Sequence, residues 1–437
     1  MKKTGTLEEK EEEAIQKIKE LAKKHNIAVS YSGGKDSTVT LHLAKRAGIR
    51  DVVHIHGDHE SPRSLPFVIK TCRKLDMNLE IIEPFRSLRE LVDLIGAPSR
   101  KRKWCSKVFR FAPIAEHSKR TGKDLYLTGV RAEEGSRRKT QPRYRKGPGV
   151  QSFTFKPIFD WSEDDVWSYI EKYDLPVHPN YEKQPRVGCW LCPYVTRRLE
   201  EYKDYDPELY NIGVRLLRKT MDLFGLKGAD GFIDGGGWGG WSYPATKKTV
   251  GTARLVNDNI ILTFNNVKEY NKVKRNLHIL GTEYYAKDKR ITIKKGNRKC
   301  SEIRSLVERS MNCIGCGVCI GKCEAGAISV KWNKFRVDFH KCEHCLECCR
   351  QKDGIGCMAR TFLPNLKTLE GLEKNRKEVV AKDVIDYSNK VKSMVEEILW
   401  HVDALQLEGE EHINSHMHII SEIAEQIQMI TQKRILE

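Results

Sequence analysis

The sequence predicts an α/β protein that opens with a parallel sheet covered by helices and continues into smaller units. Short apolar runs alternate with helical periods from residue 27 to residue 128, the pattern of parallel strands joined by crossover helices. Nine of the 14 cysteines crowd between Cys313 and Cys357. The 437 residues, 39% of them hydrophobic, suffice for several cores. We therefore expect a modular chain.

The elements of the first unit each have a local reason. Residues 7–25 place Ala14, Ile15 and Ile18 on one face of an amphipathic helix. Ser162 is expected to cap a helix over 161–173, with acidic residues in its first turn. Apolar runs predict strands at 27–31, 52–55, 79–82 and 125–128, and helical periods predict helices at 37–47, 64–75, 87–95 and 107–120.

The second half of the chain is expected to contain a link, a small α/β unit and two long helices. After about residue 205 the pattern loosens into a Gly/Trp-rich link at 235–241. Strands at 260–264 and 290–293 with a helix between them predict a small α/β unit. Beyond residue 370, apolar stripes predict two long helices that form a hairpin and serve oligomerisation. The expected parts are 1–26, 27–205, 206–300, 301–364 and 365–437.

Charge and cysteine content exclude several classes of protein. No apolar run is long enough to span a bilayer and the first residues lack the apolar core of a signal peptide, so we expect a cytosolic protein without a membrane partner. In a reducing compartment, many cysteines indicate metal binding or catalysis. The net charge is +18, and residues 101–150 hold fifteen Lys and Arg against four Asp and Glu. Such a patch fits either nucleic acid or a small polyanion.

A glycine-rich loop follows the first strand directly and precedes a helix. Its residues are Ser32-Gly33-Gly34-Lys35-Asp36-Ser37. Glycines allow a tight turn and a close approach to an anion, amides at the helix start donate to phosphate oxygens, and Lys35 adds a positive charge. The loop is not the Gly-x4-Gly-Lys-Ser/Thr sequence of common nucleotide triphosphatases. We expect a phosphate-binding loop.

Several motifs in order resemble the PAPS-reductase (sulfonucleotide reductase) branch of the PP-loop superfamily. The resemblance covers about 170 residues, in which the first unit is the PP-loop, or adenine nucleotide α-hydrolase-like, domain. Besides the loop, the motifs are Trp104-Cys105-Ser106-Lys107, Thr128-Gly129-Val130-Arg131-Ala132-Glu133-Glu134, Pro157-Ile158-Phe159-Asp160-Trp161, Asp165-Val166-Trp167, Leu175-Pro176-Val177-His178-Pro179 and Arg186-Val187-Gly188-Cys189-Trp190-Leu191-Cys192-Pro193. The last is similar to archaeal and bacterial members.

The resemblance implies a set of nucleotide-binding residues. Ser32, Gly33, Gly34, Lys35, Asp36 and Ser37 would form the anion loop, with Lys35 also catalytic, and Gly129, Arg131 and Arg186 would approach the nucleotide. A basic loop over the substrate would hold Arg137, Arg138, Lys139, Arg143, Arg145 and Lys146. A solvated basic loop is the alternative.

The cysteine-dense block resembles a two-cluster ferredoxin. Cys313, Cys316, Cys319 and Cys323 have the spacing of its first run, and Cys342, Cys345 and Cys348 that of its second, with Cys357 displaced. Because the fourth cysteine of each run crosses over in this fold, one [4Fe-4S] cluster is assigned to Cys313, Cys316, Cys319 and Cys357, the other to Cys342, Cys345, Cys348 and Cys323. Zinc is the alternative. A pair of one-electron carriers suits a two-electron reduction.

The remaining cysteines include a second candidate site. Cys189 and Cys192 form a Cys-x2-Cys knuckle, and Cys105 lies near it in the resembled family. These three could bind zinc or a third iron–sulfur cluster, with Cys300, Cys349 or a nonprotein ligand as the fourth. Cys72, inside an apolar helix, is interpreted as a core residue.

The resemblance implies a PAPS reductase of anaerobic, archaeal type, acting in sulfate assimilation. It would convert PAPS, less readily APS, to sulfite and adenosine 3',5'-bisphosphate with electrons from an external low-potential donor, as a homodimer or hetero-oligomer. The C-terminal Cys-Gly-Leu-His type segment of known reductases is missing, so Cys105 is the first choice of nucleophile, before Cys300 and Cys349.

Two other function classes stay open. Many sulfonucleotide reductases have lost the Gly-Gly-Lys-Asp that this chain keeps, which favours an ATP-dependent tRNA-modifying enzyme with RNA as partner. The ferredoxin-like block and the helical tail also fit an electron-transfer subunit, although the intact Lys35 and Asp36 speak against it.

Overall fold

The computed structural model describes residues 5–147, 151–184, 186–195, 199–226, 233, 237–242, 246–350, 356–371 and 421. Residues 1–251 and 255–368 form one compact unit. A second unit consists of 252–254 and 369–437, of which only 252–254, 369–371 and Ser421 are described. The expected helical hairpin therefore lies outside the described residues, apart from Ser421.

A six-stranded sheet forms the centre of the first part of the chain. Its order is β3-β2-β1-β4-β6-β5. All neighbours are parallel except β5 and β6, which run antiparallel. The strands are β1 (Ile27–Ser30), β2 (Asp51–Ile55), β3 (Asn78–Ile82), β4 (Leu125–Leu127), β5 (Tyr144–Lys146) and β6 (Phe153–Phe155). The predicted parallel sheet is confirmed, whereas β5 and β6, three residues each, were too short to predict.

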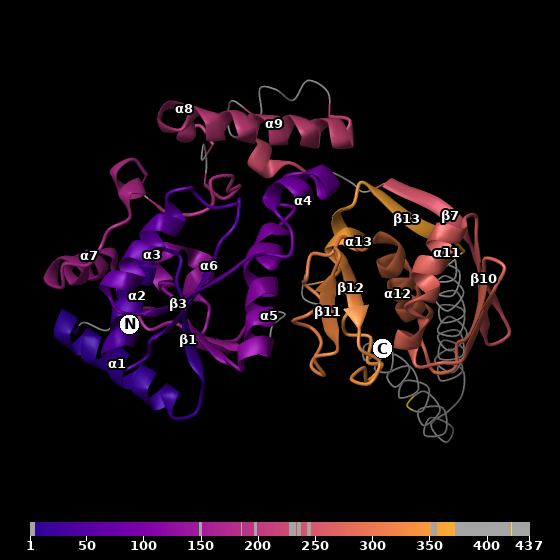
Figure 1. Ribbon diagram of the computed structural model, residues 1–437, viewed down its shortest axis with the longest axis horizontal. Coiled ribbons are helices and arrows are strands. Elements are labelled where there is room, and N and C mark those ends of the chain that lie inside the picture. The colour runs from indigo at the N-terminus through magenta and orange to yellow at the C-terminus, as the bar shows by residue number, and fades with distance from the viewer. Residues whose placement is uncertain are drawn as a thin grey trace, which may run out of the picture. The chain divides into compact units, whose positions relative to one another are not determined.

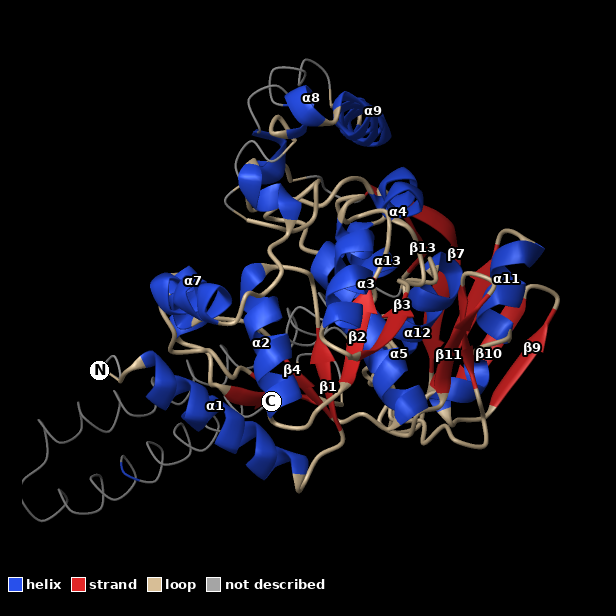
Figure 2. Cartoon of the chain, turned by 60° about the vertical axis from the view of Figure 1, so that its left-hand side comes forward, coloured by secondary structure: helices blue, strands red, loops and turns tan. Residues whose placement is uncertain are grey.

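Helices cover both faces of this sheet (Figure 2). On one face, Val29 and Val52 pack with apolar residues of four helices. On the other, Ala28, Val53 and Tyr126 pack with Ile114 of α5 (Ala112–Thr121). The four helices are α1 (Leu7–Ala22), α2 (Lys35–Arg46), α3 (Ser64–Lys74) and α7 (Glu163–Lys172), the last with the predicted Ser162 cap.

A second apolar cluster is built where the sequence pattern loosens. The expectation of an irregular link after residue 205 is wrong, because α9 (Pro207–Phe224) begins there with an Asp206 cap and Pro at its first position. Its buried side chains pack with α4 (Leu88–Ile95) and with Trp104, Trp190 and Trp238. Short elements nearby are the π-helix η1 (Lys107–Phe111), α8 (Tyr202–Tyr205), η2 (Ala132–Glu134), α6 (Ser136–Lys139), η3 (Pro179–Glu182) and η4 (Gly237–Gly240).

A five-stranded sheet follows, in the order β13-β7-β8-β10-β9. It confirms the two predicted strands with a helix between them and adds three strands to them. The elements are β7 (Thr246–Val256), β8 (Asn259–Phe264), α11 (Val267–Lys274), η5 (Leu277–Leu280), β9 (Tyr284–Lys287), β10 (Arg290–Lys294), α12 (Cys300–Asn312) and β13 (Asn365–Glu370). The domain boundaries set out above stay predictions.

The cysteine-dense segment folds as two loops around a hairpin. The first loop follows α12, the hairpin is β11 (Ile328–Lys331) and β12 (Lys334–Val337), and the second loop leads to α13 (Met358–Phe362). Ile320 and Ile328 pack against Ala115 of α5, so α5 lies between the parallel sheet and the hairpin (Figure 1). Within the part of the chain that the structure describes, no helix has the length and apolar character needed to cross a bilayer.

Candidate functional site

The glycine-rich loop joins the carboxyl end of β1 to α2, as predicted. Gly33 has φ +79°, a conformation that favours glycine, and Gly34 is the N-cap of α2. The Ser37 hydroxyl donates to the Gly34 carbonyl at 2.8 Å and lies 3.1 Å from the Ser32 hydroxyl. The amide of Lys35 donates to the Tyr181 hydroxyl at 3.0 Å. The start of α2 thus presents the positive end of a helix at a strand end.

Gly129 brings β4 against this loop. A Cβ atom at residue 129 would lie 2.5 Å from the carbonyl carbon of Asp36 and from the amide nitrogen of Ser37. Both are backbone atoms of the first turn of α2, which cannot rotate away. Glycine is therefore required for the end of β4 to approach the phosphate loop this closely.

Asp36 holds the two nearby cations in place. One carboxylate oxygen lies 2.5 Å from Nε of Arg131, and the other 3.1 Å from Nζ of Lys35. Lys35 is also 3.4 Å from Glu163, and Arg131, only 2% exposed, is 3.0 Å from Glu133. The predicted residues Lys35, Asp36 and Arg131 therefore meet, and Glu163, which sequence reasoning missed, belongs with them.

Three further arginines gather around this point. Burial, together with the charges of Arg186, Arg110 and Arg131, lowers the pKa of Arg138 to about 10, although Asp36 opposes the shift. The surrounding protein and the charge of Arg186 also lower the pKa of Arg110. Both Arg110 and Arg186 are exposed to solvent. Such a group of like charges favours a bound polyanion.

The predicted basic loop is only partly a loop. Residues 136–139 form α6, residues 144–146 form β5, and the side chain of Arg137 is outside the described structure. Arg143 donates to the carbonyl oxygens of Lys156 and Pro157 and pairs with Glu13 at 2.9 Å. The Arg143 side chain therefore ties the edge of the sheet together.

Cys105, Cys189 and Cys192 lie close enough to influence one another. Burial and the Cys192 thiolate raise the pKa of Cys105 to about 11. Burial and both other thiolates raise the pKa of Cys189, while Arg110 opposes the shift. A thiol with such a pKa is mostly protonated near neutral pH and is a weak nucleophile. A metal ligand must also be a thiolate, so the raised pKa does not decide between the two roles, and the ligand and nucleophile assignments of Cys105 both stay predictions.

Four thiols of the ferredoxin-like block line one cavity. Cys313, Cys316, Cys319 and Cys357 surround about 330 Å³ of empty space, which includes the open mouth, together with Arg309 and Phe335. Burial followed by the charges of the other three cysteines raises the pKa of Cys316. The four side chains assigned to one cluster therefore meet, although Cys357 is displaced in sequence.

The second set is gathered around Cys323. Burial and the charges of Cys348 and Cys345 raise the pKa of Cys323, whose sulfur accepts a hydrogen bond from the Ala327 amide at 3.2 Å. Cys342 lies three residues before Cys345 in the second loop. Cys349 is fully buried and accepts a hydrogen bond from Arg309 at 3.3 Å, so it is enclosed by protein.

Zn–S bonds of about 2.3 Å put neighbouring sulfurs of a tetrahedral site about 3.8 Å apart. Among the described residues, which include all 14 cysteines, no three sulfurs lie within 4.8 Å of one another; one other group, containing no cysteine, meets that limit. The metal group that either set of cysteines would hold stays a prediction.

One apolar cluster borders both cysteine sites. Trp104 and Phe109 lie in it beside Cys105, and Ile314 and Val318 lie in it beside Cys316 and Cys357. The cysteine loop is also fitted closely to the first part of the chain, because a Cβ at residue 317 would lie 2.1 Å from the Phe85 ring. The two sites are therefore separated by packed side chains.

Sequence reasoning missed Tyr181, Arg110 and Glu163 at the phosphate site. Tyr181 lies in a short 3-10 turn. Arg110 faces the cysteines from a π-helical turn, a structure that hydrophobic periodicity does not predict. A histidine pair at residues 54 and 56 was also missed. Its signal is two histidines with one residue between them at the end of a parallel strand, where both side chains share a face.

Comparison with known proteins agrees with the fold and the loop. Residues 26–195 match the family model described as the phosphoadenosine phosphosulfate reductase domain. An uncharacterized protein of Methanocaldococcus jannaschii is 31% identical over 49% of this chain and 53% of its own length. A phosphoadenosine 5'-phosphosulfate reductase of Xanthomonas axonopodis is 28% identical over 43% of this chain and 78% of its own length.

Among solved structures, the phosphoadenylyl-sulfate (PAPS) reductase of Candida auris in a phosphate complex aligns with a TM-score of 0.33 and 18% identity, covering 42% of this chain and 94% of its own. The chain spans about half the length of the first two curated relatives it matches. The comparisons confirm the coarser prediction: an α/β domain of the PP-loop type, similar to that of PAPS reductases, occupies residues 26–195.

Proposed function

We propose that the chain is a sulfonucleotide reductase that converts PAPS, and less readily APS, to sulfite. The observation that carries the proposal is the shared apolar cluster, which borders Cys105 near the phosphate loop and Cys316 and Cys357 in the ferredoxin-like block. An anion-binding loop and a thiol-lined cavity within one compact unit suit a reduction of an anionic nucleotide. The match of residues 26–195 to the PAPS reductase domain supports the substrate class.

The reaction balances as a two-electron cleavage. The bond between the sulfate sulfur and the phosphate oxygen breaks with its electron pair leaving on the oxygen, two electrons supplied by the external donor through the cysteine-bound clusters would pass to sulfur, and sulfite and adenosine 3',5'-bisphosphate leave. The phosphate loop and the start of α2 would bind the phosphates. Arg110, Arg138 and Arg186 would balance the charge that grows on the leaving phosphate, and the proximity of Arg110 to Cys105 and Cys189 supports a place for that phosphate near the cysteines.

The cysteines would hold the redox groups. Cys313, Cys316, Cys319 and Cys357 would bind one [4Fe-4S] cluster, and Cys323, Cys342, Cys345 and Cys348 a second. Cys105, Cys189 and Cys192 would bind a third. Such clusters supply single electrons at low potential. Arg309, only 2% exposed, lies against Phe335 and near Cys319, Cys348 and Cys357, so its positive charge would offset the charge of the ligated thiolates.

One alternative has a specific observation in its favour. Lys35 and Asp36 are both present and held in place, as an enzyme that binds ATP on this loop would need. Such an enzyme would activate a tRNA base and release AMP and pyrophosphate. It would not form sulfite from a sulfonucleotide.

An anaerobic assay separates the two functions. The full chain, reduced by a low-potential donor, is given PAPS, APS, or ATP with tRNA. Sulfite from PAPS with an equal amount of adenosine 3',5'-bisphosphate is the expected result. Absence of sulfite from either sulfonucleotide, with AMP and pyrophosphate formed from ATP, would overturn the proposal.

Iron content and a matched pair of variants sharpen the assay. Three clusters predict about twelve irons per chain, and the two ferredoxin-like clusters alone about eight. Cys105→Ser should abolish sulfite formation while nucleotide binding persists. Cys72→Ala, at a buried cysteine in α3 that is assigned to no redox group, is the control and should keep its activity. Full activity in Cys105→Ser would exclude Cys105 as ligand and as nucleophile.

A further inference from the structure

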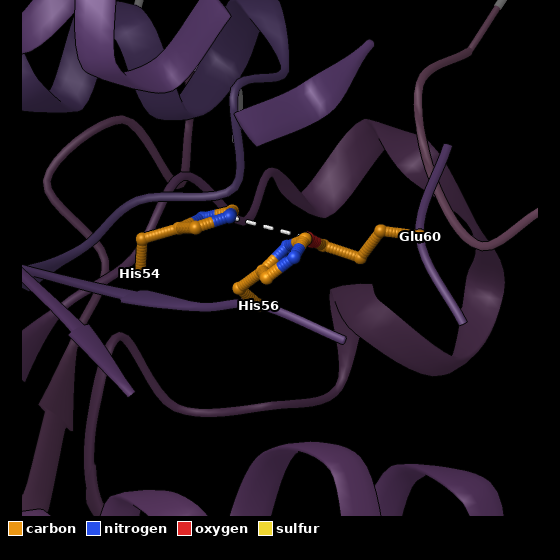
Figure 3. Close-up of side chains that lie close together, drawn as sticks. All are labelled: His54, His56 and Glu60. Carbon is orange, nitrogen blue, oxygen red and sulfur yellow. Dashed lines mark ion pairs between the residues drawn. The ribbon is translucent and has the colours of Figure 1, made fainter. Parts of the chain in front are cut away.

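Three side chains with metal-binding atoms converge at the carboxyl end of β2, and the charge of one of them, Glu60, acts on Cys189. His54 lies in β2 and His56 directly after it, so both point to the same face of the sheet. Glu60 reaches them from the loop that follows, and Figure 3 shows the three groups pointing toward one another. One ligand atom of each lies within 4.8 Å of the other two.

The distances between these atoms fit ion pairs in the metal-free chain and are also close to those between the ligands of one metal ion. His54 Nε2 lies 3.1 Å and His56 Nδ1 3.6 Å from Oε2 of Glu60. All three atoms are buried and have no partner with hydrogen-bond geometry. Metal–ligand bonds of about 2.0–2.2 Å put neighbouring ligands of a tetrahedral zinc site about 3.3–3.6 Å apart. The observed distances are close to that range.

The hydrogen bond made by Nδ1 of His54 determines whether Nε2 of the same ring is a donor or an acceptor. His54 Nδ1 lies 2.9 Å from the carbonyl oxygen of Tyr31, an oxygen that can only accept, so Nδ1 carries a proton. In the neutral ring Nε2 is then a lone-pair acceptor that faces the oxygen of a carboxylate. A backbone carbonyl that orients a histidine in this way is the usual outer partner of a metal-bound imidazole. His54 is fully buried, which fixes this orientation.

The pair of His117 and Glu80 shows how the protein satisfies a buried histidine and a carboxylate without a metal. His117 Nε2 lies 3.3 Å from Glu80, and its Nδ1 is 2.6 Å from the Tyr126 hydroxyl. Arg120 also binds Glu80, so the carboxylate has a second protein partner. At His54, the second group beside the carboxylate is His56, another imidazole with an unpartnered nitrogen. Two protons, one between each imidazole nitrogen and the carboxylate oxygen, would be needed to serve all three atoms, whereas one metal cation would serve all three at once.

We propose that His54, His56 and Glu60 bind a divalent transition-metal ion of the zinc class. Two imidazoles and one carboxylate are a preferred ligand set for such ions, and three protein ligands leave a position for water or an anionic oxygen. Tyr31, which orients His54, directly precedes the phosphate loop, so the ion would lie at the same sheet edge as the bound anion. The inference is independent of the reductase proposal.

The test measures zinc binding and the zinc ligands in the full, cluster-loaded chain. Protein freed of adventitious metal is given one equivalent of Zn²⁺, dialysed, and examined by zinc-edge X-ray absorption, which iron does not obscure. The expected result is one retained zinc with a nitrogen/oxygen shell at about 2.0–2.1 Å and no sulfur shell at about 2.3 Å. No retained zinc, or a sulfur shell, would overturn the proposal.

Variants tie the zinc to these residues. Glu60→Gln keeps the shape of the side chain, and His56→Ala removes a side chain that is partly exposed. Each variant should weaken zinc binding at least about tenfold. The control variant Glu80→Gln, in the His117–Glu80 pair, should bind zinc as the unaltered protein does. Equal zinc affinity in all three variants would refute the assignment. Urea midpoints of Glu60→Gln and Glu80→Gln control for unfolding, and sulfite formation is not needed for any readout.

Discussion

Gly129→Ala perturbs the contact between β4 and the phosphate loop more directly than any other single change. The added Cβ would lie 2.5 Å from two backbone atoms of the first turn of α2, where ordinary contact begins at 3.4 Å. The end of β4 and the start of α2 would have to separate by about 0.9 Å to relieve the overlap. Overpacking in a rigid site costs about 1–3 kcal/mol, and backbone neighbours place this one near the upper end, at about 3 kcal/mol.

The same displacement moves the groups that would bind phosphate. The amides at the start of α2 and the Asp36 carboxylate, which holds Lys35 and Arg131, belong to the displaced turn. We expect the affinity for adenosine 3',5'-bisphosphate to fall at least about tenfold, since one misplaced charged hydrogen bond costs about 1.5–3 kcal/mol. Urea denaturation measures the first effect, and calorimetric titration of the folded variant measures the second.

Gly240→Ala is the matched control, because a Cβ at residue 240 meets nothing within 4 Å. It should leave both the free energy of unfolding and the affinity within about 0.5 kcal/mol of the unaltered protein. A Gly129→Ala variant as stable as Gly240→Ala, with the same nucleotide affinity, would refute the packing argument.

Three further outcomes follow from other contacts. Arg131→Ala should destabilise the protein by about 3 kcal/mol in urea denaturation because it leaves the Asp36 carboxylate with one partner fewer in a buried site, whereas Arg50→Ala, in an exposed pair, should cost less than about 1 kcal/mol. Burial and nearby positive charges lower the pKa of His42 to about 4. The unfolded chain therefore binds more protons than the folded chain between about pH 6.5 and pH 4, so the free energy of unfolding falls as the pH falls through that window. His42→Gln should make the free energy of unfolding less dependent on pH there. Gly317→Ala, with φ +75° and Phe85 at 2.1 Å, should lower the iron content of purified protein; unchanged iron would contradict the packing of the cysteine loop.

The parallel sheet and its phosphate loop could be predicted because their signals are local. An apolar strand, a glycine-rich turn and a helical period follow one another between residues 27 and 47, and the structure has β1, the loop and α2 there. The resemblance to a two-cluster ferredoxin likewise implied which thiols meet, and the structure puts Cys357 beside Cys313, Cys316 and Cys319. The clusters themselves stay a prediction.

Other features depend on contacts that no local pattern encodes. The α9 helix was missed because glycine- and tryptophan-rich sequence follows it, although its Asp206-Pro207 start is a recognisable signal. Arg143 was placed over the substrate by the family resemblance, whereas its partners Glu13 and Pro157 come from other parts of the chain. The site at His54 requires knowing that Glu60 folds back onto the end of β2.

The central claim is that electrons held by the protein's own cysteine-bound groups reduce a nucleotide bound on the phosphate loop. A single-turnover experiment tests it most directly: the chain is reduced, excess reductant is removed without oxygen, and PAPS is added while sulfite and the electrons lost from the protein are both counted. The account predicts one sulfite for every two electrons lost, and loss of this coupling in Cys316→Ser, whose thiol lines the cavity. Reoxidation without sulfite, or sulfite at full yield in Cys316→Ser, would contradict it.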